Sequence, residues 1–361
     1  MIEKIYLDAH SATRPDPWII DSFSSNLQEQ WRTFSSLEAL EKLKASLGAA
    51  KESTFVLTGS TGETMEQIFL ANYIDVVRER GRNHLLTTPL EELPTLQAIK
   101  RFEELDCAAK WITLNEQGQV TKEALEEALN PRTALVSLSW ANGLTGVVHP
   151  LADIAKVCKE KDVKLHVDAS YVIGKLHFQL QDLGVDFFSF DGALLHAPRG
   201  ISGFFRKGVS DIENLPALSA LNEAVEQTLS RFESVCTETA RLRDYFERGI
   251  RAGFKEAQIL FETAERLPNC TAIAFPGVHA ETLLYALQRQ GIYASIGGGR
   301  FQKLSALLKT CGVEEPLCHS ALSFSLSHDT TQEEVERAVE IIVATAKKQS
   351  GYSAQLFRGG R

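Results

Sequence analysis

Through the first two hundred residues, short apolar runs alternate with amphipathic stretches of helical periodicity. This alternation strongly constrains the fold, because it is typical of an α/β protein in which helices cover both faces of a mostly parallel sheet. The helix expected at 121–130 begins with a threonine cap and carries a glutamate nearby; a second is expected at 150–162. The expected strands are 54–59, 84–89, 133–140, 163–170, 185–190 and 201–206.

The pattern changes after Gly208, where residues 215–253 predict a long helical stretch. Strands at 270–277 and 322–329 and helices at 280–291 and 331–349 follow it. A chain of 361 residues is too long for one compact core, so a second, smaller α+β domain is expected. The predicted division is a large domain at 14–232, a small domain formed by 1–13 with 233–350, and a flexible tail at 351–361.

Composition excludes several classes of partner. The net charge of −9 gives no electrostatic reason to bind nucleic acid or an anionic membrane. No apolar run approaches the ~20 residues that span a bilayer, and the N-terminus has no signal-peptide pattern. The six cysteines are scattered without a C-x-x-C pair, which predicts reduced thiols rather than a zinc site or disulfide framework. These features favour a cytoplasmic protein that binds neither nucleic acid nor membranes.

Several stretches, in consistent order, resemble the cysteine desulfurase family, which belongs to the class V aminotransferase group of fold-type I pyridoxal-phosphate enzymes. The resemblance covers nearly the whole chain. It implies a large domain with a mostly parallel seven-stranded sheet between helices, a smaller C-terminal α+β domain, and a dimer. The stretches include TGSTGET (58–64), ANGLTGVVHPL (141–151), HVDASYVIGK (166–175), GVDFFSFDG (184–192), PRGISGFF (198–205) and LSFSLSHDTTQEEVE (322–336).

The family holds its cofactor through a lysine, because an amine can form a reversible Schiff base with the cofactor aldehyde. The loop SFDGALLHAPRG (189–200) resembles the loop that carries this lysine, and Leu194 stands at its position. Asp191 stands where the family has a serine that binds the cofactor phosphate. A carboxylate ~4 Å from a phosphate would oppose binding by roughly 4 kcal/mol per charge pair at an effective dielectric constant near 20.

Other family positions also differ. Glu92 replaces the histidine that stacks on the cofactor ring, and Tyr171 replaces a glutamine. Ser323 replaces the arginine expected to hold the substrate carboxylate, and the position of the sulfur-accepting cysteine falls near Gly298. No cysteine lies within ten residues of that glycine. The expected remnant of the cofactor pocket is Thr61, Glu92, Asn142, Asp168, Tyr171 and Asp191.

These replacements predict that pyridoxal phosphate has been lost and that no catalytic residue or bound metal remains. The chain is then interpreted as a catalytically inactive desulfurase-like protein with a non-catalytic or regulatory role. The resemblance implies a homodimer, and an active desulfurase paralogue or a sulfur-transfer protein is a further expected partner.

Two alternatives stay open. The chain could be an active pyridoxal-phosphate enzyme with relocated residues, although Lys175, the lysine nearest the old site in sequence, is expected to be structural. It could also be a cofactor-independent enzyme, or a binder of a ligand or of a cation such as Mg²⁺, if Glu92, Asp168 and Asp191 converge in an acidic pocket. The GGGR segment (297–300) is expected to be a loop remnant rather than an anion site.

Overall fold

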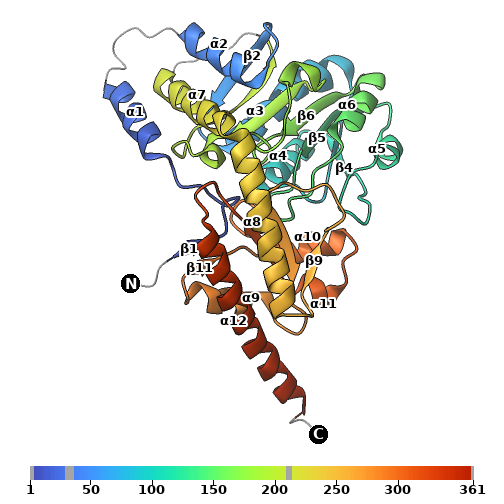
Figure 1. Cartoon of the computed structure of the whole chain (residues 1–361). Coiled ribbons are helices and arrows are strands. Elements are labelled where there is room, and N and C mark those ends of the chain that lie inside the picture. Colours follow the sequence, from blue (N-terminus) through green and yellow to red (C-terminus); the bar gives the residue numbers. More distant parts are fainter. Residues whose placement is uncertain (1–3, 29–35, 209–213, 359–361) are drawn as a thin grey trace.

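The computed structural model describes residues 4–28, 36–208 and 214–358. It consists of an upper lobe built around a sheet and a lower lobe into which the long helix α8 (Phe232–Gly253) descends (Figure 1). Within the described part of the chain, no helix is both long enough and apolar enough to cross a lipid bilayer.

The upper lobe contains a seven-stranded sheet in the order β2-β8-β7-β6-β5-β3-β4. Only β8 runs against its neighbours, so the expected α/β class with a mostly parallel sheet is confirmed. All seven residues of the central strand β5 are buried, as is usual for a parallel strand covered on both faces. The strands are β2 (Ser53–Thr58), β3 (His84–Thr87), β4 (Ala108–Trp111), β5 (Thr133–Ser139), β6 (Lys164–Asp168), β7 (Phe187–Asp191) and β8 (Ser202–Lys207).

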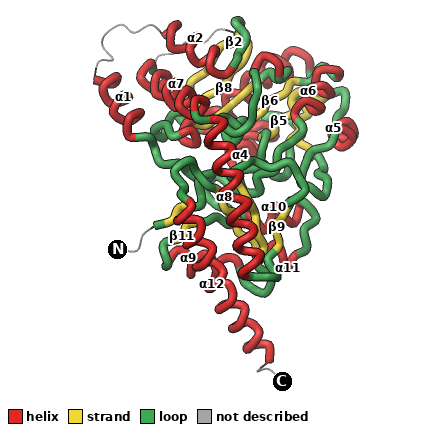
Figure 2. The backbone as a smooth tube through the Cα atoms, in the orientation of Figure 1, coloured by secondary structure: helices red, strands yellow, loops and turns green. Residues whose placement is uncertain are grey.

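Helices surround this sheet (Figure 2). In α6, apolar residues three and four positions apart, such as Leu151, Ile154 and Cys158, are buried. The predicted threonine cap is present, since Thr121 Oγ1 accepts a hydrogen bond from the Ala124 N–H at 3.2 Å. The helices are α1 (Pro17–Gln28), α2 (Ser36–Leu47), α3 (Thr61–Asn72), the π-helix η1 (Tyr73–Arg78), α4 (Leu93–Glu103), α5 (Lys122–Ala128), α6 (Leu151–Glu160), the 3-10 turns η2 (Leu180–Asp182) and η3 (Gly192–Leu195), and α7 (Leu215–Ser230).

The lower lobe contains two small sheets, β12-β10-β9 and β1-β11. Its core includes Ile5 and Leu7 together with apolar residues between 242 and 346, so the N-terminal strand packs with the C-terminal half of the chain. The elements are β1 (Ile5–Tyr6), α8, β9 (Gln258–Leu260), β10 (Cys270–Ala274), α9 (Ala280–Gln288), β11 (Ile292–Tyr293), α10 (Leu304–Thr310), α11 (Glu315–Cys318), β12 (Ala321–Ser325) and α12 (Gln332–Arg358). The domain boundaries stay a prediction.

The structure differs from the sequence expectations in three places. The edge strand β4 was not expected, because its residues are mostly exposed and give no apolar pattern. The long helical stretch is broken at Arg231 into α7 and α8. The helix expected at 331–349 is longer, because α12 continues to Arg358; the flexible tail expected at 351–361 stays a prediction, and residues 359–361 lie outside the described residues.

Gly203 in β8 offers a test of how closely the sheet is packed. A Cβ at this position would overlap the Phe55 ring and the Val56 carbonyl oxygen. We expect Gly203→Ala to lower the free energy of unfolding by about 1–3 kcal/mol, as measured by urea denaturation, because overpacking forces the strands apart. Gly351→Ala in α12 is the control: nothing lies within 4 Å of its Cβ, so it should be neutral or slightly stabilising. Equal effects of the two substitutions would contradict the packing described for β8.

Candidate active site

The carboxyl ends of the central strands bring several predicted residues together. Asp168 is the last residue of β6 and Asp191 the last residue of β7. Glu92 follows β3 and stands at the N-cap of α4. Ligands of open α/β sheets bind at this edge, which makes it the candidate site.

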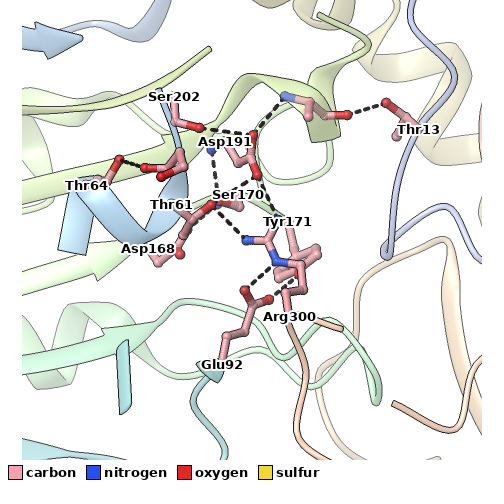
Figure 3. Close-up of polar contacts among 12 residues, drawn as sticks. Thr13, Thr61, Thr64, Glu92, Asp168, Ser170, Tyr171, Asp191, Ser202 and Arg300 are labelled. Carbon is pink, nitrogen blue, oxygen red and sulfur yellow. Dashed lines mark hydrogen bonds and ion pairs between the residues drawn. The ribbon is translucent and has the colours of Figure 1, made fainter. Parts of the chain in front are cut away.

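The guanidinium of Arg300 lies among these acidic side chains (Figure 3). Its Nε donates to Glu92 Oε2 at 2.5 Å, and its Nη1 donates to Asp191 Oδ2 at 2.8 Å. Its Nη2 lies 3.5 Å from Thr61 Oγ1. Arg300 follows three glycines at positive φ, so a tight loop turns its side chain back over the sheet. One arginine therefore pairs with two of the acids expected to form an acidic pocket.

Asp191 accepts hydrogen bonds on both carboxylate oxygens. Besides Arg300, Oδ2 accepts from Thr61 Oγ1 at 3.1 Å. Oδ1 accepts from Ser202 Oγ at 3.2 Å and from the Ala193 N–H at 3.0 Å, the latter capping η3. A charged carboxylate with four such partners is well compensated, even though it stands where the family has a neutral serine.

Tyr171 closes one side of this cluster. Its hydroxyl donates to Glu92 Oε1, and its ring lies 6.1 Å from the Phe301 ring in a stacked arrangement. The Arg300 guanidinium carbon lies 5.8 Å from the centre of the Tyr171 ring, within the range of a cation–π contact. The tyrosine is 2% exposed, so the cluster is shielded from water on this side.

The electrostatics of the cluster follow from burial and close pairing. Burial alone would lower the pKa of Arg300, but the nearby carboxylates of Glu92 and Asp191 outweigh it and hold that pKa well above its usual value. Burial raises the pKa of Asp168, although the Ser170 N–H donates to its Oδ1 at 2.9 Å. Burial also raises the pKa of the neighbouring Glu91 to about 7. The site can thus hold a fixed cation beside acids that protonate more easily than usual.

The remaining predicted residues are engaged in packing and turns. Leu194 lies in η3 and is 5% exposed within the main core. Asn142 Oδ1 accepts from the N–H groups of Leu144 and Thr145 at 3.0 Å, so it shapes a turn. Ser323 Oγ donates to the Leu144 carbonyl at 2.6 Å. Gly298 is at φ 96°, with nothing within 4 Å of a Cβ built there.

The structure brings Thr61, Glu92, Tyr171 and Asp191 around the guanidinium of Arg300. The sequence analysis had assigned this arginine to a loop remnant. Asp168 lies near this group, and Arg300 opposes the rise in its pKa. Three acids expected to converge in a low-dielectric pocket favour a nearby cation, but they do not indicate which residue supplies it.

The family model for aminotransferase class-V matches residues 24–208 and 204–338. The chain belongs to the aminotransferase class-V family. A cysteine desulfurase of Nostoc sp. strain PCC 7120 is 28% identical over 372 residues, covering 94% of this chain and 92% of the relative. A cysteine desulfurase of Bradyrhizobium diazoefficiens is 30% identical over 369 residues, covering 93% and 92%.

Solved structures of NifS-like proteins share the fold. A NifS-like protein superimposes with a TM-score of 0.84 at 25% identity, covering 94% of this chain and 98% of the other. A NifS-like protein from Rickettsia africae gives a TM-score of 0.82 at 23% identity, covering 96% and 100%. The expected fold-type I architecture and the cysteine desulfurase-like character are therefore confirmed.

These relatives correct one expectation. The predicted loss of pyridoxal phosphate is contradicted, because the relatives along nearly the whole chain are cysteine desulfurases, which depend on that cofactor, and nothing shows its loss. The residues of the site fit the cofactor only in part. Asp168 stands where the family's acid contacts the cofactor ring, whereas Leu194 offers no amine and Arg300 fills the space between Asp191 and Glu92. These residues do not fit a covalently held cofactor, because no amine stands at the position of the Schiff-base lysine.

Arg300→Met tests whether the guanidinium holds the cluster together. The change would leave Glu92 and Asp191 buried without a counter-charge, so we expect the free energy of unfolding at pH 7 to fall by about 3–5 kcal/mol. Burial raises the pKa of Glu92, and a raised carboxyl pKa favours folding as the pH falls. The loss should therefore shrink between pH 7 and pH 5, as measured by urea denaturation at both values.

Lys303→Met is the matched control, because the Lys303 side chain is 73% exposed and lies three residues further along the same loop. Its effect should stay within about 0.5 kcal/mol at both pH values. A loss below 1 kcal/mol for Arg300→Met, or a loss independent of pH, would show that the cluster does not depend on this arginine.

Proposed function

We propose that this cysteine desulfurase-like chain does not catalyse cysteine desulfuration and acts as a subunit paired with a second copy of itself. The observation that carries the proposal is Leu194, which stands in η3 directly after β7, where the family has its Schiff-base lysine. The side chain is packed in the apolar core, so the loop that should supply an amine supplies a hydrocarbon instead.

The other two requirements of desulfuration are also unmet. Sulfur transfer needs a thiolate within reach of a positioned substrate. Residues 293–302, where the family carries its mobile cysteine, hold glycines and Arg300 but no cysteine. Ser323, at the position of the carboxylate-binding arginine, donates its hydroxyl to a backbone carbonyl, and Arg300 is already paired with two acids.

The alternative of a cation site in an acidic pocket is not favoured. Arg300 already supplies the positive charge between Glu92 and Asp191, so a metal ion would have to displace a buried guanidinium. An active enzyme with relocated residues remains an outcome that the activity test below can reveal. All six cysteines are free, which supports the proposed cytoplasmic location.

The activity test supplies L-cysteine, a reductant and excess pyridoxal phosphate to the purified chain. We expect no sulfide or alanine above the protein-free background, because neither an amine at 194 nor a thiol near 298 is available. A cysteine desulfurase relative, such as the Nostoc protein, is assayed in parallel as a positive control. Leu194→Lys alone should also stay inactive, since the thiol and the carboxylate anchor are still missing. Stoichiometric sulfide and alanine from the unmodified chain would refute the proposal.

Pairing is supported by the resemblance to a dimeric family and by exposed apolar side chains on α1. Trp18 is 60% exposed, Ile20 40% and Leu27 44%. Exposed apolar groups gathered on one element favour a protein contact.

We expect sedimentation velocity to show a dimer that Trp18→Glu weakens, whereas Trp111→Glu on the edge strand β4 leaves it intact. A chain that stays monomeric at all concentrations would contradict self-pairing. If the chain formed a complex only when an active desulfurase was added, its partner would be a paralogue rather than a second copy of itself.

A further inference from the structure

A surface pocket lies beside the first turn of α6, in the upper lobe (Figure 1). It is bounded by Trp140 after β5, by the segment that enters α6, by the chain around η2, and by Glu265 after β9. Among the described residues, none that contacts the Arg300 side chain lines this pocket. It is therefore separate from the ion-pair cluster at the strand ends.

His149 presents an N–H donor without a partner. The Val120 N–H donates to its Nδ1 at 3.1 Å, so Nδ1 is an acceptor and the proton of the neutral ring lies on Nε2. Burial lowers the pKa of His149 to about 4, which keeps the ring neutral at pH 7. His149 is 3% exposed, and no described residue accepts a hydrogen bond from Nε2. This nitrogen is not sealed inside the protein, so it faces the pocket that His149 lines.

Trp140 lines the same pocket and also holds an unused donor. Its indole ring packs on the Phe178 ring with centroids 5.4 Å apart, and the residue is 7% exposed. Within the described part of the chain nothing accepts from its Nε1–H, which is not sealed inside the protein either. An indole nitrogen can only donate. An acceptor held in the pocket would therefore pair with donors on two largely buried rings that the protein leaves unpaired.

The first turn of α6 adds backbone donors at the same place. No side chain caps this helix of 10 residues, and the N–H groups of Ala152 and Asp153 have no acceptor among the described residues. Free N–H groups and the positive end of the helix dipole make such a terminus favourable for an anion. Lys156 lines the pocket one turn further along and forms no ion pair with any described residue.

We propose that this pocket binds a small carboxylate. Its oxygens would accept from the Trp140 Nε1–H, from the His149 Nε2–H and from the free N–H groups at the start of α6. A carboxylate suits this set because it only accepts hydrogen bonds, and it offers about four lone-pair positions to several donors at once. The ammonium group of Lys156 would add a favourable charge.

The charged side chains of the pocket favour a ligand with one negative charge over a ligand with two. The charged and titratable side chains that line it beside His149 are Asp153, Lys156, Lys159, His177, Asp182 and Glu265. Three carboxylates thus face two ammonium groups, so each further negative charge on the ligand meets additional repulsion. A carboxylate is therefore expected to bind more tightly than a doubly charged phosphate.

The indole N–H of Trp140 provides a direct readout, because the chain holds only four tryptophans. The test records the indole signals of the full chain, labelled with ¹⁵N-tryptophan, at pH 8 while acetate replaces chloride at constant ionic strength. Trp140→Phe identifies the signal of Trp140. We expect this signal to move downfield and to saturate, whereas the signal of Trp111, which is 48% exposed and lies outside the pocket, stays in place. Phosphate should need a several-fold higher concentration than acetate.

Calorimetric titration with acetate tests the donors separately. Trp140→Phe keeps a ring against Phe178 but removes the N–H, so it should weaken acetate binding at least about tenfold, because a hydrogen bond to a charged group is lost. Trp111→Phe is the matched control and should leave binding unchanged. Lys156→Met should weaken binding about two- to fivefold, since an exposed ion pair contributes little. Lys309→Met, at a side chain that is 71% exposed on α10, should have no effect.

Three results would overturn the proposal. The first is the absence of a saturable movement of the Trp140 signal when acetate is added to the unmodified chain, a measurement that does not depend on the folding of any variant. The second is tighter binding of phosphate than of acetate. The third is an acetate affinity that Trp140→Phe leaves unchanged.

Discussion

The pairing of Arg300 with Glu92 and Asp191 is the interaction on which the architecture of the site depends. The arginine comes from the loop after β11, whereas the acids come from the carboxyl edge of the main sheet. Each of these side chains is largely buried, with exposed side-chain fractions of 16%, 7% and 14%. Removing any one partner leaves a buried charge uncompensated, which costs far more than a surface ion pair contributes. The loop and the sheet edge therefore hold one another in place.

The residues that differ from the desulfurase pattern are explained better as a set than one by one. Asp191 would oppose an anion at the serine position, but it is a suitable partner for a guanidinium with Thr61 and Ser202 beside it. Glu92 offers no ring to stack on, yet it accepts from both Arg300 and Tyr171. Arg300 thus couples Thr61, Glu92, Tyr171 and Asp191. A substitution at any of these positions changes the environment of the others.

The sequence was sufficient for the parallel sheet, because strands such as β5 are apolar along their whole length and are separated by capped amphipathic helices. The sequence did not predict β4, because the residues of this edge strand are mostly exposed and it joins the sheet only by backbone pairing with β3. Spacing placed Asp168 and Asp191 at adjacent strand ends. It could not place Arg300, because the direction of that side chain depends on three successive glycines at positive φ, which no periodic pattern encodes.

The same pairing limits what the strand ends can bind. The Arg300 guanidinium is fixed by two carboxylates, and Glu92 also accepts from the Tyr171 hydroxyl. A cluster whose groups are already paired gains little from a ligand, because a new contact must first break an existing one. The edge of the sheet where the family performs its chemistry is therefore occupied in this chain by an internal ion-pair network.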